Sequence, residues 1–210
     1  MKNNSCIIIF CKYPEAEKVK TRLGREIGHK KAVNIYKIFL KNLGKILNKI
    51  DKDKIIFMNS LSNEKYFTNL FGNNNKYYLQ TGNNLGEKMF LAFKKVFSLG
   101  YKNAVIIGSD VPEITDTIIN KGINLLDKKH FVIGPTIDGG YYLLGINKNN
   151  LDKIIFEDID WSTDKVFKQT CNKIKILNKS KILLKKLNDI DTLSDLKNYI
   201  SRTNNTNLIC

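Results

Sequence analysis

The chain has 210 residues, of which 42% are hydrophobic and 26% charged, so its composition favours one soluble domain and excludes a disordered chain. No apolar run approaches the ~18 residues that a membrane span requires, and the first residues resemble a strand rather than a signal peptide, so we expect a cytoplasmic protein. The formal net charge is +15, but the lysines are spread evenly and aromatic residues do not interleave with them, so no specific nucleic-acid partner is expected.

In chain order, hydrophobic periodicity first predicts a buried strand at 6–12, an amphipathic helix over 27–50, a strand at 54–60 and a short helix over 63–71. It then predicts a strand at 76–80, a helix over 85–98, a strand at 104–110, a helix near 115–127 and a strand at 131–136. The pattern is less regular after residue 140, where it predicts a strand in YYLLGI, a helix over 162–172 and short strands at 173–177 and 181–187.

Strands that alternate with helices predict an α/β fold with a mostly parallel central sheet, helices on both faces and a few added antiparallel strands. We expect one domain over residues 1–200 and a polar C-terminal tail over 201–210. Four cysteines (Cys6, Cys11, Cys171 and Cys210) form no CxxC pair and no zinc-type spacing, which indicates free structural thiols.

The segment GPTIDGGYYLLG at 134–145 interrupts an apolar stretch with Asp138, Gly139 and Gly140. Strand interiors disfavour aspartate and glycine, so this is a turn between two buried strands. A turn former is the simplest interpretation of Asp138 alone. An active-site turn, where missing side chains let a ligand approach the backbone, is the alternative.

Ligands bind beyond the carboxyl ends of the strands in an open parallel sheet. Lys12, Lys20 and Arg22 follow the first strand, Asp110 follows the fourth and Asp138 follows the fifth. Carboxylates and phosphate oxygens are the ligands of Mg²⁺, while arginine and lysine neutralise phosphates. If the segment around Lys20 is extended, the side chains of Lys20 and Arg22 point the same way. These residues together predict a metal and phosphate site.

Each candidate also has a purely structural interpretation. Asp110 could cap the helix near residue 115, and Glu87 suits the first turn of its helix. Ser162 or Thr163 could cap the next helix. Asp191 fits the polar lead-in of the last helix, where Asp191 or Thr192 is the N-cap and Asp195 stands at capping-box distance from Thr192.

Six motifs occur in a characteristic order over about residues 6–197: FCKYPEAEKVKTRL, LGEKMFLAF, VIIGSDVPEIT, GPTIDGGYYLLGI, IDWST and DIDTLSDL. They resemble a bacterial family formerly described as a domain of unknown function and now called glycosyltransferase-A-like. This family is similar to the nucleotide-diphospho-sugar transferase superfamily and to the guanylyl- and cytidylyltransferases of cofactor biosynthesis.

The resemblance implies a single Rossmann-like GT-A domain that binds a nucleotide and Mg²⁺ or Mn²⁺. It places Lys12, Lys20, Thr21 and Arg22 at the nucleotide phosphates, and Gly86 and Glu87 near the nucleotide. It places Asp110 at the metal, and Asp138, Gly139 and Gly140 at the acceptor and phosphate side of the cleft. Asp110 and Asp138 are the expected catalytic residues.

Two positions depart from the family pattern. The family has P-x-x-G-x-V-K-T-R-L, whereas Glu17 stands at the glycine position here. An acidic residue is therefore expected near the phosphates, in a less tight loop. GSDVP also carries one aspartate rather than D-x-D, which leaves the second metal ligand open between Asp138 and, less favoured, Asp160.

Three functions fit these motifs. The first is a glycosyltransferase that uses a nucleotide sugar and an undefined small-molecule acceptor. The second is a nucleotidyltransferase that uses a nucleoside triphosphate and a phosphorylated acceptor and releases pyrophosphate. The third is a nucleotide-binding scaffold without catalysis. A monomer and a homodimer both suit a domain of this size.

Overall fold

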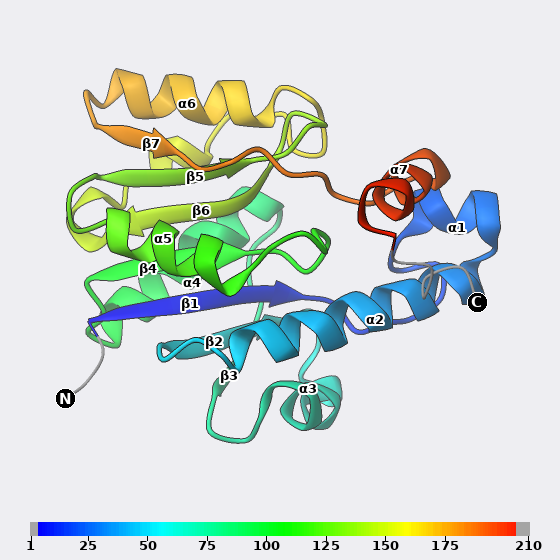
Figure 1. The fold of residues 1–210 in the computed structure, drawn as a ribbon. Helices are drawn as coiled ribbons and strands as arrows, with labels where there is room; N and C mark the ends of the chain where they lie inside the picture. Colours follow the sequence, from blue (N-terminus) through cyan, green and yellow to red (C-terminus); the bar gives the residue numbers. More distant parts are fainter. Residues whose placement is uncertain (1–3, 205–210) are drawn as a thin grey trace.

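The apolar run SCIIIFC forms strand β1 (Ser5–Cys11) in the middle of a seven-stranded sheet (Figure 1). The computed structural model describes residues 4–204. Ile7 and Ile9 pack into the core on one face of the sheet, and Cys6 and Ile8 pack into the core on the other. Because successive side chains of a strand point to opposite faces, a continuous branched run suits a strand that is covered on both sides.

The strand order is β3-β2-β1-β4-β6-β5-β7. The other strands are β2 (Asp53–Met58), β3 (Lys76–Leu79), β4 (Asn103–Ile107), β5 (Phe131–Pro135), β6 (Tyr141–Asn147) and β7 (Lys181–Leu183). Strand β6 runs antiparallel to its neighbours β4 and β5, while the remaining neighbours pair in parallel. The predicted α/β fold with a mostly parallel sheet and antiparallel additions is therefore confirmed.

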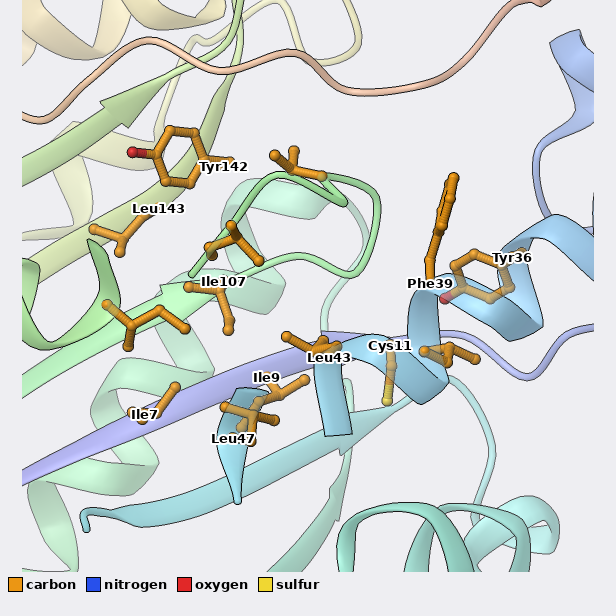
Figure 2. Close-up of a cluster of buried hydrophobic side chains, with 14 of the residues drawn as sticks. Ile7, Ile9, Cys11, Tyr36, Phe39, Leu43, Leu47, Ile107, Tyr142 and Leu143 are labelled. Atoms are coloured by element: carbon orange, nitrogen blue, oxygen red, sulfur yellow. The ribbon is translucent and has the colours of Figure 1, made fainter. Parts of the chain in front are cut away.

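Helices cover both faces of this sheet. One face carries α1 (Thr21–Ile27), α2 (His29–Leu47), α3 (Glu64–Phe71), α5 (Asp116–Leu125) and α7 (Leu193–Thr203). The other face carries α4 (Leu85–Ser98), the 3₁₀ turn η3 (Lys153–Phe156) and α6 (Val166–Ile176). Short 3₁₀ turns η1 (Leu61–Asn63) and η2 (Lys148–Asn150) complete the elements. Figure 2 shows Tyr36 and Phe39 of α2 next to Cys11 at the end of β1.

Several predicted boundaries are wrong. The strand predicted at 173–177 is the end of α6, because Val166, Thr170 and Ile174 form a buried stripe at four-residue spacing while Ile176 is exposed. The helix predicted over 162–172 starts later, at Val166. The segment at 181–187 pairs as a strand only over Lys181–Leu183, followed by one isolated bridge at Leu187.

The predicted helix over 27–50 is α2, and a separate helix, α1, precedes it where an extended segment around Lys20 was expected. At the C-terminus, α7 continues to Thr203, beyond the predicted domain boundary at residue 200. The rest of the predicted tail, residues 205–210, lies outside the described residues.

The cysteines within the described residues are free, as predicted: Cys6 and Cys11 are buried and Cys171 is half-buried. Burial raises the pKa of the Cys6 and Cys11 thiols, which suits inert core residues. Cys210 lies outside the described residues. In residues 4–204, none of the helices combines the length and the apolar character that crossing a membrane would take.

Candidate functional site

A cleft of about 570 Å³ lies beyond the carboxyl ends of β1, β4 and β5. Its walls come from segments that are far apart in the sequence: the loop after β1, the turn after β4, the turn between β5 and β6, and residues 189 and 191 before α7. The sheet brings them together because these three strands end at the same edge. In Figure 1, α1 and α7 lie side by side beyond the arrowhead of β1.

The charged residues of the cleft are Lys12, Lys18, Lys20, Arg22, Asp110, Asp138, Asp189 and Asp191. Thr21 and Gly140 also line it. Of the predicted site residues, the structure therefore brings together Lys12, Lys20, Thr21, Arg22, Asp110, Asp138 and Gly140.

Lys20 is the most buried charge in the cleft, with a side chain that is only 2% exposed. Its Nζ lies 3.0 Å from Asp110 Oδ1 and 3.1 Å from Asp191 Oδ1, and 5.8 Å from the centre of the Phe39 ring. Burial alone lowers the pKa of the ammonium, but the two carboxylates outweigh burial and raise the pKa above its ordinary value. Lys20 is therefore a fixed positive charge that links two carboxylates.

Arg22 reaches the same carboxylate from the first turn of α1. Its guanidinium forms an ion pair with Asp191 Oδ2, and its side chain remains 62% exposed. Lys20 immediately precedes α1 in the left-handed conformation, with φ of 48°. The helix start, rather than an extended segment, thus directs both cations to Asp191, and Arg22 keeps donors free toward solvent.

Asp191 is held in place by the start of α7. Thr192 is the N-cap and accepts a hydrogen bond from the Asp195 backbone N–H, while the Asp195 carboxylate accepts from Thr192 N–H at 2.8 Å and Asp191 N–H at 3.1 Å. The predicted capping box is confirmed. Because the cap orders the backbone at residue 191, the Asp191 side chain is free to face the two cations.

Asp110 follows the turn after β4 and does not cap a helix, because the N-cap of α5 is Thr115. The preceding residue, Ser109, forms a hydrogen bond of 2.8 Å with the hydroxyl of Tyr36, and that hydroxyl accepts one from Lys12 N–H at 3.1 Å. Burial raises the pKa of the Tyr36 phenol, which therefore stays neutral. This network joins the turn after β4 to the loop after β1, so the cation loop and Asp110 have a fixed relative position.

Asp138 lies in the turn between β5 and β6, where its Oδ1 accepts hydrogen bonds from the Thr136 hydroxyl and from Gly140 N–H at 3.1 Å. Gly139 has φ of 92°, and a Cβ there would lie 2.1 Å from the Asp164 carbonyl oxygen. A side chain at this position would clash with the backbone, so glycine is required by packing. Gly139 does not line the cleft, and the turn presents Asp138 and Gly140 to it.

Asp189 faces Asp138 across the same corner of the cleft. Burial, the Asp138 and Asp191 charges and a hydrogen bond with Asp138 raise the pKa of Asp189 to about 7. A proton on Asp189 up to about neutral pH lowers the negative charge at this corner of the cleft. The cleft therefore holds two pairs of aspartates: Asp110 and Asp191 form ion pairs with Lys20 and Arg22, whereas Asp189 holds a proton beside Asp138 up to about neutral pH.

The backbone conformation of Glu17 shows why the family pattern has glycine at this position. Its φ of 65° is left-handed, a conformation that costs most residues free energy and costs glycine little. Its side chain is exposed and does not line the cleft.

Gly86 and Glu87 lie at the start of α4, outside the cleft. A Cβ on Gly86 would lie 2.6 Å from the Phe156 carbonyl oxygen and 2.7 Å from the Trp161 ring, so this glycine permits close packing. The Glu87 carboxylate accepts a hydrogen bond of 2.7 Å from Asn83 N–H, as suits a first-turn residue. Asp160 also lies outside the cleft, where it bonds with Gln169.

The N-cap predicted at Ser162 or Thr163 is wrong, because Lys165 precedes α6 and no side chain caps it. Ser162 instead lines the cleft with φ of 66°. Asp189 and Asp191 were not predicted as site residues, because the predicted capping box already accounted for the polar residues before the last helix. The signal that could have found them is DIDTLSDL itself, whose first two aspartates are not needed for the cap.

The donor set suits a divalent cation that also binds phosphate. Two carboxylates, Asp110 and Asp191, point an oxygen each at one positive charge, the Lys20 ammonium. Among residues 4–204, no three His, Cys, Asp or Glu side chains converge closely enough to hold a metal by themselves. Mg²⁺ commonly takes one or two protein carboxylates and completes its shell with phosphate oxygens and water, so this arrangement fits a cation that arrives with a nucleotide.

Comparisons with known proteins agree with this fold. The model of a family described as uncharacterized proteins conserved in bacteria, DUF2064, matches residues 42–163. A crystal structure from Desulfovibrio desulfuricans G20, provisionally named a nucleotide-diphospho-sugar transferase, is 33% identical, with a TM-score of 0.91 over 97% of this chain and 89% of that one. No curated protein matches the sequence.

More distant structures share the fold alone. The 4-diphosphocytidyl-2C-methyl-D-erythritol synthase of Anaerococcus prevotii DSM 20548 is 13% identical, with a TM-score of 0.59 over 97% of this chain and 96% of that one. CMP:2-keto-3-deoxy-manno-octonic acid synthetase, solved with CTP, is 8% identical, with a TM-score of 0.59 over 97% and 99% of the two chains. The family match covers more than half of the sequence and confirms the resemblance carried by the six motifs. The chain belongs to the bacterial DUF2064 family.

Proposed function

We propose that this protein is a transferase that binds a nucleotide sugar in the cleft beyond β1, β4 and β5 and passes the sugar to a small-molecule acceptor. The observation that carries the proposal is the buried Lys20 ammonium, held between Asp110 and Asp191 at one end of a 570 Å³ cleft. A fixed cation beside partly exposed carboxylates suits a ligand that brings both phosphates and a metal ion. The similar structure named after nucleotide-diphospho-sugar transfer supports the same choice.

The cations of the cleft have two different roles, because some can bind phosphate directly and one is held in a fixed position. Lys12 and Arg22 are exposed and can turn donors toward phosphate oxygens, with Arg22 able to offer a fork of two N–H groups. Lys20 is held by its two carboxylates and acts as a fixed charge at the cleft wall. The hydroxyl of Thr21 adds a neutral donor to the same cleft.

Asp110 is the first candidate to hold Mg²⁺ or Mn²⁺, with Asp191 or Asp138 as its partner. When bound, the cation would stabilise the negative charge that develops on the leaving phosphate. Without a bound metal ion, Lys20 holds the Asp110 and Asp191 carboxylates close to each other.

Nucleotidyl transfer is the second candidate. The loop after β1 and the first turn of α1 present four cations to the cleft (Lys12, Lys18, Lys20 and Arg22), more than a diphosphate alone requires. The structure solved with CTP also shares this fold. In that reaction a nucleoside triphosphate would bind the same cleft, and pyrophosphate would leave.

A thermal-shift panel of nucleotide sugars and nucleoside triphosphates, each with and without Mn²⁺, tests the proposal. A bound ligand raises the melting temperature because it stabilises only the folded state. We expect the largest shift with a nucleotide sugar and Mn²⁺, and a smaller shift in Arg22→Met. Arg25→Met is the matched control, since Arg25 lies on the same helix outside the cleft. A preference for triphosphates would favour nucleotidyl transfer, a shift without turnover would favour a scaffold, and no shift at all would contradict all three.

A further inference from the structure

A second cavity of about 330 Å³ lies beside the cleft, between the start of α4 and the segment from η3 to Trp161. The two cavities share a wall. Leu85 lines the cleft while Asn84 and Glu87 line the second cavity, and Ser162 lines the cleft while Trp161 lines the second cavity. A molecule in the second cavity would therefore be close to a ligand in the cleft.

Gly86 allows close packing at this wall. A Cβ at this position would lie 2.7 Å from the Trp161 ring, so only glycine allows α4 and the Trp161 segment to meet there. The predicted role of Gly86 at the nucleotide gains no support from this geometry, but Gly86 does set the position of Trp161 between the two cavities.

The floor of the second cavity is aromatic. Trp161 and Phe90 are half-buried, and Phe90 packs against Phe156 with ring centres 6.0 Å apart. Half-buried rings offer an apolar surface to a ligand without giving up their contacts with the core. The C–H face of a sugar ring is a suitable partner for such a surface, as is an ammonium group.

The rim of the second cavity is acidic. Glu87, Glu157 and Asp158 line it together with one lysine, Lys153, which pairs with Glu157 at 2.9 Å. Carboxylates accept hydrogen bonds from hydroxyl and amine groups and repel phosphate. The cavity therefore differs from the cleft, which is lined by four cations as well as four aspartates.

We propose that the second cavity binds the acceptor, and that the part of the acceptor bound there is a polyhydroxylated ring, neutral or amine-bearing, without a phosphate. This inference rests on the proposed function and sharpens it. An acceptor without phosphate at this site favours sugar transfer over nucleotidyl transfer to a phosphorylated acceptor.

Trp161 is the single tryptophan of the chain and lines this cavity, so a ligand that contacts it there changes the tryptophan fluorescence. The full-length protein is titrated into the millimolar range with methyl α-glucoside, glucosamine and glucose 6-phosphate. We expect a saturable change with the first two sugars and none with the phosphorylated one. Saturation by glucose 6-phosphate, or no saturable change with either of the other sugars, would overturn the proposal.

Glu157→Lys tests the acidic rim, and Glu64→Lys is its control because Glu64 lies on α3, outside both cavities. Both carboxylates are at the surface, so neither variant is expected to disturb the core. We expect Glu157→Lys to weaken glucosamine binding at least about tenfold, as the loss of one charge-assisted hydrogen bond implies, and Glu64→Lys to bind like the wild type. Equal binding by both variants would overturn the assignment.

Calorimetry with a nucleotide sugar on the same protein separates this inference from the proposed function. If the nucleotide sugar binds and no glycoside does, the cavity assignment alone is wrong. If glycosides bind and no nucleotide does, the cavity assignment holds and the proposed transfer reaction is wrong.

Discussion

The cleft contains two pairs of carboxylates that are neutralised in different ways. Asp110 and Asp191 share the buried ammonium of Lys20, whereas Asp189 keeps its own proton beside Asp138, because burial and neighbouring charge raise the pKa of Asp189 to about 7. A lysine keeps its charge throughout the physiological pH range, but the Asp189 proton leaves as the pH rises. With Arg22 also paired to Asp191, the first pair keeps its positive partners at every working pH, whereas the second gains negative charge near neutrality.

This difference suggests separate tasks for the two ends of the cleft. The Lys20 pair has a fixed geometry and a fixed charge, which suits the positioning of phosphates and a cation. The Asp138 pair has a charge that responds to its surroundings, so a bound cation or ligand would change it most. The variants below that alter one pair leave the other in place, and the remaining variants are controls or concern the flanking backbone.

Removal of the Lys20 ammonium should have the largest effect. In Lys20→Met, Asp110 and Asp191 lose their shared partner, and we expect a loss of roughly 2–3 kcal/mol in the free energy of unfolding. This value lies below the ~3–5 kcal/mol of fully buried pairs, because the side chains of Asp110 and Asp191 are 53% and 27% exposed. Urea denaturation at pH 7 measures it.

Arg22→Met is the control for that experiment, since Arg22 pairs with the same Asp191 but is 62% exposed. We expect it to cost less than ~1 kcal/mol, as surface ion pairs do. Equal losses in the two variants would show that burial of Lys20 does not distinguish it from Arg22.

The second effect concerns pH. In the folded protein Asp189 holds its proton up to about pH 7, whereas in the unfolded chain it ionises near pH ~4. Its contribution to stability is therefore full below pH ~4 and is lost as the pH rises through about 7. Because the carboxyl is only half-buried, we expect a loss on the order of 1–2 kcal/mol.

Asp189→Asn should remove this part of the pH dependence and make the protein more stable than the wild type at pH 8. Urea denaturation from pH 4 to pH 8 in the presence of EDTA measures both the pH dependence and the stability at pH 8. Asp51→Asn, at an exposed aspartate outside the cleft, is the control for the loss of one carboxylate. An unchanged slope in Asp189→Asn would show that Asp189 does not keep a proton beside Asp138.

The third effect separates helix stability from the Lys20 pair. Thr192→Ala and Thr115→Ala each remove an N-cap, at α7 and α5 respectively, and each should cost about 1 kcal/mol. Only Thr192→Ala should also weaken nucleotide binding, because the α7 cap orders the backbone of Asp191. Thermal shift with the best nucleotide of the panel compares them. Equal nucleotide binding by both variants would mean that the cap does not position Asp191.

The smallest effect is a gain in stability. Glu17 has a left-handed backbone in the loop that leads to Lys20, so Glu17→Gly should stabilise the protein by roughly 0.5–1 kcal/mol. Ala16→Gly, at a neighbour without positive φ, should lower stability because glycine adds freedom to the unfolded chain. A loss of stability in Glu17→Gly would show that the Glu17 side chain contributes more than its backbone costs.

Much of the fold could be predicted because it depends on local patterns. The branched run of β1 suits a strand buried on both faces, and α4 spans Leu85–Ser98 as its periodicity predicted. The prediction of a strand at 173–177 was wrong because isoleucines at positions 174 and 176 are compatible with a strand as well as with a helix. Only the packing of α6 decides that Ile174 is buried and Ile176 exposed.

Half of the cleft could be predicted from the rule that ligands bind at strand ends, which selected Lys20, Arg22 and Asp110. Asp189 and Asp191 could not be found in the same way, because they approach the cleft from a segment distant in sequence that follows β7. Asp191 pairs with a lysine 171 residues away, and no local pattern encodes such a contact.

The most direct test is calorimetric titration with the nucleotide sugar that gives the largest thermal shift, with and without Mn²⁺. Asp110→Asn is compared with Asp160→Asn, because both side chains are 53% exposed and paired with a lysine, and only Asp110 lines the cleft. We predict that Mn²⁺ strengthens binding in the wild type and in Asp160→Asn but not in Asp110→Asn. Equal nucleotide-sugar affinity of the wild type with and without Mn²⁺ would contradict a cation-assisted nucleotide site at Asp110. So would an equal Mn²⁺ effect in Asp110→Asn and the wild type.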